Sequence, residues 1–307
     1  MKNILTIGTL CLFGIFIACN NEADVQDDVS TLRFVADDFI FEDASGTPTK
    51  TGFSNTGGFH WTKKDTVGIY PNSGSQVYFE MTSGAGASNA EFDGGGWDFK
   101  PASIYYSYYP FIGDIYLDRN NIPVSYAGQK QTVLNGTDHI GPGDFMYTAP
   151  TQSADGKLHF TYHHLGCILR FNLTLPAGTY TKLALCASSN IFPVTGHFDL
   201  EADTPVIVPE RYASQLQISL ENITLASEGS TFITLMACPM GLTGAETTIR
   251  LLDTDKQEWK CTYTIPKDYE AGHGYNIAAS SFELVPQSMG VIIDNWDEGA
   301  SFSGEAE

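Results

Sequence analysis

The chain has 307 residues, of which 42% are hydrophobic and 12% aromatic, and this composition excludes an intrinsically disordered protein. Asp and Glu number 36 against 16 Lys and Arg, which gives a formal net charge of −20. This acidic balance argues against a nucleic-acid-binding protein, since phosphates need clustered Lys and Arg, and against a protein held on anionic lipid headgroups. Abundant Gly, Tyr and Phe favour short strands joined by turns.

The first predicted element is a lipoprotein signal peptide over residues 1–18. Lys2 precedes a nearly continuous apolar run over residues 4–18, which is too short for a comfortable membrane span and has the form of a secretory signal. A small residue and then Cys19 end the run, as in a bacterial lipobox. The sequence therefore predicts that Cys19 is lipidated; the alternative is an ordinary signal peptide in which this cysteine is incidental.

Strand-like runs separated by turn residues fill the rest of the chain, and no helical pattern exceeds about two turns. The predicted strands are residues 31–41, 66–70, 76–82, 103–111, 158–175, 180–187, 215–220, 231–237, 247–252, 258–265, 275–284 and 289–293. This spacing is typical of β-sandwiches and predicts an all-β fold of two tandem sandwiches. We expect a leader with the first strand over residues 19–50, an N-terminal sandwich over 51–155 and a C-terminal sandwich over 156–307.

The cysteines beyond residue 19 do not form a metal-binding pattern. No two of them have a CxxC spacing, so a zinc ribbon is not supported. An exported protein can form disulfides, but these cysteines lie in apolar, strand-like runs, where a free thiol serves as a small core residue. The sequence leaves both states open for Cys167, Cys186, Cys238 and Cys261.

Catalytic and metal-binding signatures are absent from the sequence. It has no serine-hydrolase, zinc-protease, phosphate-loop or dinucleotide-binding motif, so we expect no enzyme activity and no cofactor. His159, His163 and His164 share one predicted strand, but His159 and His163 would lie about 13 Å apart along it. We therefore expect structural histidines and no metal. For the four tryptophans we expect core or edge packing; they are Trp61, Trp97, Trp259 and Trp296.

Several short stretches together carry a family resemblance. They are residues 49–53, 59–61, 65–70, 105–111, 122–123, 129–131, 144–147, 158–165, 271–275 and 292–296. In their order and spacing they resemble the fimbrillin-like family of Bacteroidetes, the type V pilus subunits made as fimbrillin A- or Mfa-like lipoprotein precursors. The resemblance spans nearly the whole exported chain, and it implies two transthyretin-like β-sandwich domains.

The resemblance implies a structural pilus subunit or a pilus-tip adhesin in cell adhesion. Such proteins are lipid-anchored to the outer membrane as precursors and lie outside the cell in a pilus when mature. A trypsin-like maturation protease would cut near the mature N-terminus, and a strand from a neighbouring pilus subunit would replace the released leader strand. We expect the cut at Lys50, beyond the first strand; Arg33 is the other candidate, but a cut there would leave the strand in place.

The donor strand and the remaining partners follow from the same resemblance. The donor candidate is the C-terminal stretch with alternating apolar residues Phe282, Leu284, Met289, Val291 and Ile293. The lipoprotein export machinery and a host protein or glycan receptor would be further partners. The alternative function is a monomeric, surface-exposed lipoprotein that binds host or dietary glycans, since such proteins also combine a lipid anchor with β-sandwiches.

Overall fold

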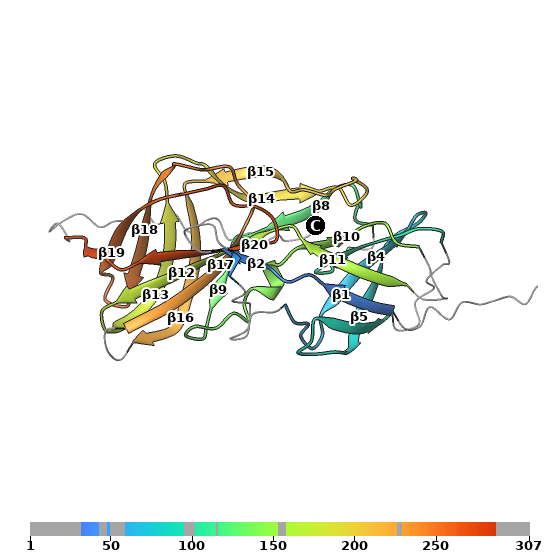
Figure 1. Ribbon diagram of the computed structural model, residues 1–307, viewed down its shortest axis with the longest axis horizontal. Helices are drawn as coiled ribbons and strands as arrows, with labels where there is room; N and C mark the ends of the chain where they lie inside the picture. The colour runs from blue at the N-terminus through green and yellow to red at the C-terminus, as the bar shows by residue number, and fades with distance from the viewer. Residues whose placement is uncertain are drawn as a thin grey trace, which may run out of the picture.

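The computed structural model describes residues 32–42, 48–49, 59–94, 102–114, 116–152, 158–225 and 229–286. The regular elements among these residues are strands, with one short 3₁₀ helix, η1 (Gly141–Gly143). The predicted all-β fold is confirmed. Among the described residues, no helix has the length and apolar character needed to cross a membrane. In Figure 1 the strands form two groups along the longest axis of the molecule, with a small sheet lying along one side.

Seven strands close into a barrel, in the order β1-β11-β10-β7-β4-β5-β6. Their bounds are β1 (Leu32–Ala36), β4 (Thr66–Pro71), β5 (Val77–Ser83), β6 (Asn89–Asp93), β7 (Tyr105–Tyr109), β10 (Met146–Thr148) and β11 (His159–His164). The expected N-terminal pair of sheets is therefore one continuous sheet. The physical reason is that β1 pairs with β11 on one side and β6 on the other, which leaves no free edge in the barrel.

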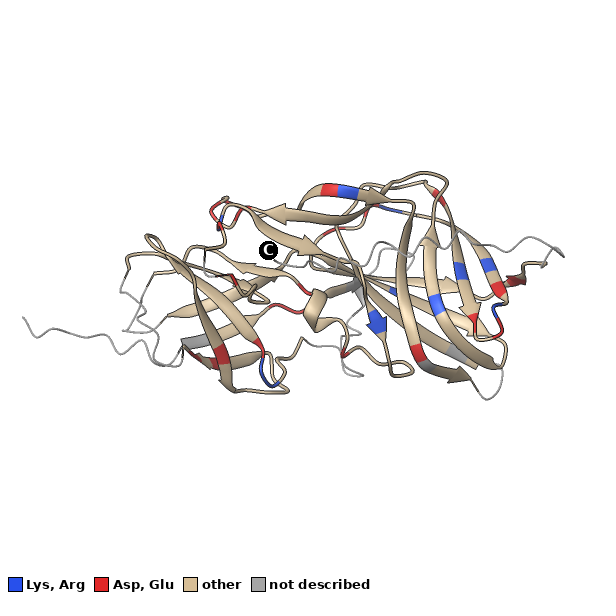
Figure 2. Ribbon diagram, turned by 180° about the vertical axis from the view of Figure 1, so that it is seen from behind, with Lys and Arg blue, Asp and Glu red and all other residues tan. Residues whose placement is uncertain are grey.

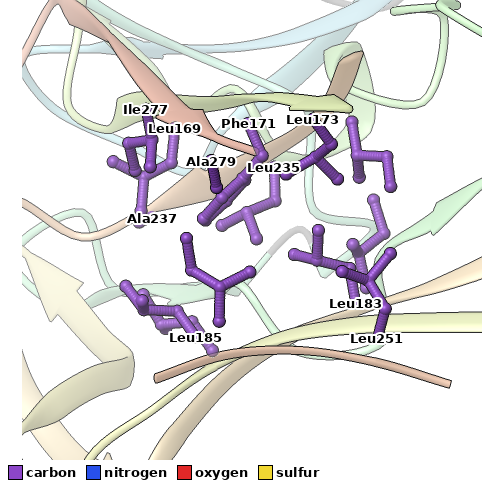
Figure 3. Close-up of a cluster of buried hydrophobic side chains, with 14 of the residues drawn as sticks. Leu169, Phe171, Leu173, Leu183, Leu185, Leu235, Ala237, Leu251, Ile277 and Ala279 are labelled. Carbon is purple, nitrogen blue, oxygen red and sulfur yellow. The ribbon is translucent and has the colours of Figure 1, made fainter. Parts of the chain in front are cut away.

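Two further sheets face each other across the largest core. The first has the order β17 (Gly229–Ala237), β12 (Cys167–Leu175), β20 (His273–Ala279), β2 (Ile40–Glu42) and β3 (Pro48–Thr49). The second has the order β21 (Glu283–Leu284), β19 (Glu258–Thr264), β18 (Glu246–Asp253), β13 (Gly178–Cys186), β16 (Gln215–Leu225) and β9 (Lys130–Gln131). Figure 3 shows Leu169 and Leu235 from one sheet facing Leu183 and Leu251 from the other.

A three-stranded sheet and a third core join the barrel to these sheets. The small sheet has the order β15 (Val208–Ala213), β14 (Phe192–Phe198) and β8 (Ile122–Ser125). The third core combines barrel residues such as Tyr70 and Tyr108 with Ile122 of β8, Ile168 of β12 and Met236 of β17. The barrel and the sandwich are thus packed together through a shared apolar layer.

The chain passes from the barrel to the sandwich between β11 and β12, at Leu165 and Gly166. Strands from the first half of the chain also join the C-terminal sheets: β9 pairs with β16, and β2 pairs with β20. The predicted boundary between two domains at residues 155 and 156 stays a prediction. The sheets do not divide there, because strands from before this point pair with strands from after it. In Figure 2, Lys and Arg alternate with Asp and Glu along the described strands.

Candidate functional site

The strand β1 holds the barrel closed, which makes its position the candidate functional site. It runs parallel to β11, with Phe34 opposite Phe160, and antiparallel to β6, with Val35 opposite Asn89. The pairing of β1 with β11 is parallel and joins residues more than 120 positions apart in the sequence, so the two strands do not form a hairpin. Without β1, the facing edges of β6 and β11 would both lose their hydrogen-bonding partner.

The inward face of β1 fills the barrel with apolar groups. Phe34 is fully buried and lies in ring contact with three barrel residues. The ring centroids are 4.4 Å from Phe92, 5.2 Å from Phe160 and 6.0 Å from Tyr162. Ala36 is also buried, whereas Val35, on the other face, is 39% exposed. This alternation is the one expected for a strand with one face in a core.

Trp61 lies at the centre of the same aromatic cluster. Its side chain is fully buried, and its ring packs edge-on against Phe92 and Tyr109 at 5.1 and 5.5 Å between centroids. The indole Nε1–H donates a hydrogen bond to the carbonyl oxygen of Ser88 at 3.1 Å, so the buried donor is satisfied. The expected packing role of Trp61 is thereby confirmed. Trp259 is partly buried against the sandwich core, and Trp97 and Trp296 lie outside the described residues.

The link between β1 and β2 is held by two adjacent histidines at the end of β11. The carboxylate of Asp37 lies 2.6 Å from Nδ1 of His163. The carbonyl oxygen of the same residue lies 2.7 Å from Nε2 of His164. The ring of Phe39 stacks on His164 with 3.7 Å between centroids. The next residue along the link, Asp38, accepts a hydrogen bond from the backbone N–H of Phe59 at 2.9 Å.

His164 is itself fixed by a buried carboxylate. Its Nδ1 lies 2.8 Å from Oδ1 of Asp144, and both side chains are almost completely buried. Burial alone would lower the pKa of His164, but the carboxylate of Asp144 and the carbonyl oxygen of Asp37 favour the protonated ring and raise it overall. The protonated imidazole can donate to both acceptors at once. His163 and His164 thus have the structural role that was predicted for them, but the sequence did not show that their partner is the link between β1 and β2.

The other predicted site residues are distributed as follows. Cys19, Lys50, Met289, Val291 and Ile293 lie outside the described residues. Arg33 lies within β1, so a cut there would divide the strand between two fragments.

Two of the donor candidates, Phe282 and Leu284, lie directly before strand β21 and within it. Phe282 packs against the sandwich core, and Leu284 pairs with Trp259 of β19. Within one chain, Phe282 and Leu284 thus already have contacts in the sandwich, and the donor assignment stays a prediction.

The four cysteines that the structure describes are free thiols. Cys167 and Cys238 are buried in different cores, and the Sγ of Cys167 donates to the carbonyl oxygen of Cys238 at 3.6 Å. Burial raises the pKa of the Cys238 thiol to about 12, which makes it a poor nucleophile. Of the two states that the sequence left open, the structure has the free thiols.

No cluster in the described ranges has the composition of a metal site. Groups of three or more His, Cys, Asp or Glu arranged to hold a metal ion are not found among these residues. A small hollow of about 140 Å³ opens beside Asp144 and is lined by Phe59, Asp65 and Tyr109. Strands β6 and β11 bind the extended chain of β1 through main-chain hydrogen bonds and an apolar inner face.

Comparisons with known proteins address the fold. No family model matches the chain, and no curated protein matches its sequence. Among solved structures, a "putative cell adhesion protein" from Bacteroides uniformis aligns with a TM-score of 0.54 at 14% identity, over 84% of this chain and 96% of the other. A protein of the same description from Bacteroides ovatus aligns with a TM-score of 0.51 at 13% identity, over 84% and 96%.

The chain has the fold of these Bacteroides proteins. At this level of identity the likeness concerns the fold, which agrees with the family resemblance in the sequence motifs. The tip fimbrial protein Mfa3 from Porphyromonas gingivalis, in a form with a C-terminal truncation, also aligns, over 83% of this chain and 98% of the truncated chain, with 9% identity and a TM-score of 0.38.

Proposed function

We propose that the protein is a pilus subunit or pilus-tip adhesin that assembles by strand exchange. It would be exported as a lipid-anchored precursor and act in cell adhesion outside the cell. The observation that carries this proposal is the position of β1, which closes the barrel between β6 and β11 although it belongs to the extreme N-terminal part of the described chain. The fold shared with the two Bacteroides proteins supports a surface role.

Loss of β1 would make the binding of a replacement strand energetically favourable. It would uncover the aromatic groups that now surround Phe34, and apolar surface costs about 25 cal/mol per Å² when it is exposed to water. It would also leave two unpaired strand edges, which favour the addition of another chain. A strand from a second copy that alternates apolar and outward-facing residues would cover the aromatic groups and pair with both edges, which is β-augmentation.

Processing at Lys50 would release the whole leader. Lys50 directly follows β3, so a cut after it separates β1, β2 and β3 from all later strands. A cut at Arg33 would leave most of β1 attached to the chain. We therefore propose Lys50 as the site of a trypsin-like maturation protease and other copies of the chain, or related pilus subunits, as assembly partners.

Limited trypsin treatment of the full chain followed by size-exclusion chromatography tests the proposal. We expect an early cut after Lys50 and slow growth of oligomers from the cut protein, while uncut protein stays monomeric. The variant Lys50→Gln is the matched control and should resist both. Cut protein that stays monomeric on long incubation would contradict strand exchange.

The lipid anchor is tested separately. The variant Cys19→Ser should lose the lipid mass and leave the membrane fraction, because stable anchoring requires more than one acyl chain at the N-terminus. Unchanged membrane fractionation of the variant would show that Cys19 is not the anchor.

A second candidate function, glycan binding by a monomer, rests on one exposed aromatic residue. Tyr116 is 82% exposed and lies beside a hollow of about 360 Å³ that is also lined by Asn72, Asp118, Arg119 and Asn120. An exposed ring beside polar groups is a suitable platform for a sugar. Binding to a glycan array that is lost in Tyr116→Ala, by a protein that keeps its N-terminus and stays monomeric, would favour this function.

A further inference from the structure

The C-terminal sequence repeats the pattern of the strand that closes the barrel. Residues 32–39 read LRFVADDF, and residues 289–296 read MGVIIDNW. Both segments have apolar residues at the first, third and fifth positions and Asp at the sixth. The seventh position is Asp or Asn, and the eighth is a large aromatic residue. The match ends there, because residues 40–42 read IFE whereas residues 297–299 read DEG.

The strand part of the two segments fits one face of the barrel. Phe34 and Ala36 are the buried positions of β1, and the corresponding residues of the C-terminal segment are Val291 and Ile293. Val291 is smaller than Phe34, and Ile293 is larger than Ala36, so the total apolar volume on that face is nearly kept. Cores tolerate such volume-conserving changes well. At the exposed position, Ile292 corresponds to Val35.

The link part of the two segments fits the contacts made by the histidines. Asp294 corresponds to Asp37, whose carboxylate lies 2.6 Å from Nδ1 of His163. Asn295 corresponds to Asp38, which accepts the backbone N–H of Phe59 through a side-chain oxygen that Asn also possesses.

The aromatic position completes the match. Trp296 corresponds to Phe39, which is buried with its ring stacked 3.7 Å from the centroid of His164. His164 cannot easily turn away, because the buried Asp144 holds its other ring nitrogen at 2.8 Å. The barrel therefore offers a pre-formed place for an acid, an acceptor and an aromatic ring in a set order after the strand.

We propose that residues 289–296 of a second copy bind in the register of residues 32–39, and that His163 and His164 select this donor by its Asp–X–aromatic sequence. This inference rests on the proposed strand exchange and assigns its register and its specificity-determining residues. The described chain ends at residue 286, shortly after β21, so the donor segment follows directly from an edge strand of the sandwich.

The register is tested by disulfide trapping with a peptide of residues 287–299. The protein carries a site for a specific protease at residues 43–47, so that the leader can be cut off without reliance on Lys50. With Ile292→Cys in the peptide, the proposed register predicts cross-linking to Asn89→Cys, which pairs with Val35. The peptide with Gly290→Cys should instead cross-link to Glu91→Cys, the partner of Arg33, and not to Asn89→Cys. The protein background removes the two partly exposed thiols with Cys186→Ser and Cys261→Ser.

The selectivity is tested by the affinity of unlabelled peptides for the cut protein. Trp296→Ala should weaken binding roughly 10- to 100-fold, as expected for loss of a buried ring. Asp294→Ala should weaken it less, by no more than about fivefold, because the corresponding contact between Asp37 and His163 is partly exposed. Ile292→Ala is the matched control and should change the affinity less than about threefold, because its counterpart Val35 is exposed. In the protein, His164→Ala should remove the preference for Trp296 over Ala.

The outcomes separate this inference from strand exchange itself. Oligomers of cut protein together with cross-links in a shifted register, or equal affinities for the Trp296→Ala and parent peptides, would overturn the inference and leave strand exchange standing. Cut protein that neither oligomerises nor captures the peptide would overturn both. Cross-links confined to the predicted pairs, with the predicted loss of affinity, would support it.

Discussion

The barrel and the sandwich are both built from strands, but they differ in how they are completed. The sandwich has long strands of nine to eleven residues, such as β12, β13 and β16, and most of their pairing is with strands from the C-terminal half of the chain. The barrel has shorter strands and an aromatic core, and its closing strand β1 comes from the leader. The leader also contributes β2 to the sandwich, but only at three positions beside β20. The leader is therefore needed to close the barrel, whereas it adds only a short strand to one sheet of the sandwich.

The largest expected effect is that of removing the leader. After the cut and displacement of residues up to 50, amide protection should fall across β6 and β11, because both lose a hydrogen-bonded neighbour. Protection should persist in β13 and β18, which pair with each other. Hydrogen–deuterium exchange measured by mass spectrometry checks this, and an equal loss in both regions would remove the distinction.

Next in size is the effect of Phe34→Ala. The side chain is fully buried among three aromatic rings, so its truncation should lower the free energy of unfolding of the barrel by about 3–5 kcal/mol. Urea titrations followed by intrinsic tryptophan fluorescence measure this loss.

Two variants serve as controls for Phe34→Ala. Val35→Ala should cost less than about 1 kcal/mol, since this neighbour is on the exposed face. Leu183→Ala in the sandwich core should cost about 2–5 kcal/mol, but it should leave the docking of the leader unchanged. A loss of leader docking in Leu183→Ala would show that the two regions unfold as one unit.

A smaller effect is expected from His164, and it depends on pH. The pKa of His164 is raised in the folded protein, because the attraction of Asp144 and the hydrogen bond to Asp37 exceed the effect of burial. Its stabilising contribution is therefore fully present below the unfolded pKa of about 6.5 and is lost as the pH rises through the folded value.

The variant His164→Gln measures this contribution. The difference in unfolding free energy between the parent protein and the variant should shrink as the pH rises above about 6.5, with the barrel as the region affected. Asp144 does not reverse the direction, since burial raises the pKa of its carboxyl too and its contribution also falls with rising pH. A difference that grows with pH would contradict the assignment of a protonated ring.

The smallest effect is expected at β2. Ile40 is 49% exposed at the start of a three-residue strand, so Ile40→Ala should change the free energy of unfolding by no more than about 0.5 kcal/mol. Chemical denaturation of the full chain measures it. A loss as large as that of Phe34→Ala would mean that the leader is as important to the sandwich as to the barrel.

Local patterns in the sequence determined much of the architecture. Alternation in residues 32–36 and in the later runs predicted strands, and the turn residues between them predicted an all-β fold. The size and apolar character of Trp61 predicted a place in a core. The sequence also contains the match between residues 32–39 and 289–296.

Only the tertiary structure decided which strands pair and what the histidines contact. Alternation states which residues share a face, but it does not name the neighbouring strand, so the closure of the barrel by β1 between β6 and β11 was not predictable. His163 and His164 meet Asp37 across 126 and 127 residues of sequence. Contacts at such a separation depend on the folding of the whole barrel, and no local spacing records them. The sequence by itself therefore determined the kinds of elements, and the fold decided that one of them, the first strand, closes the barrel between β6 and β11.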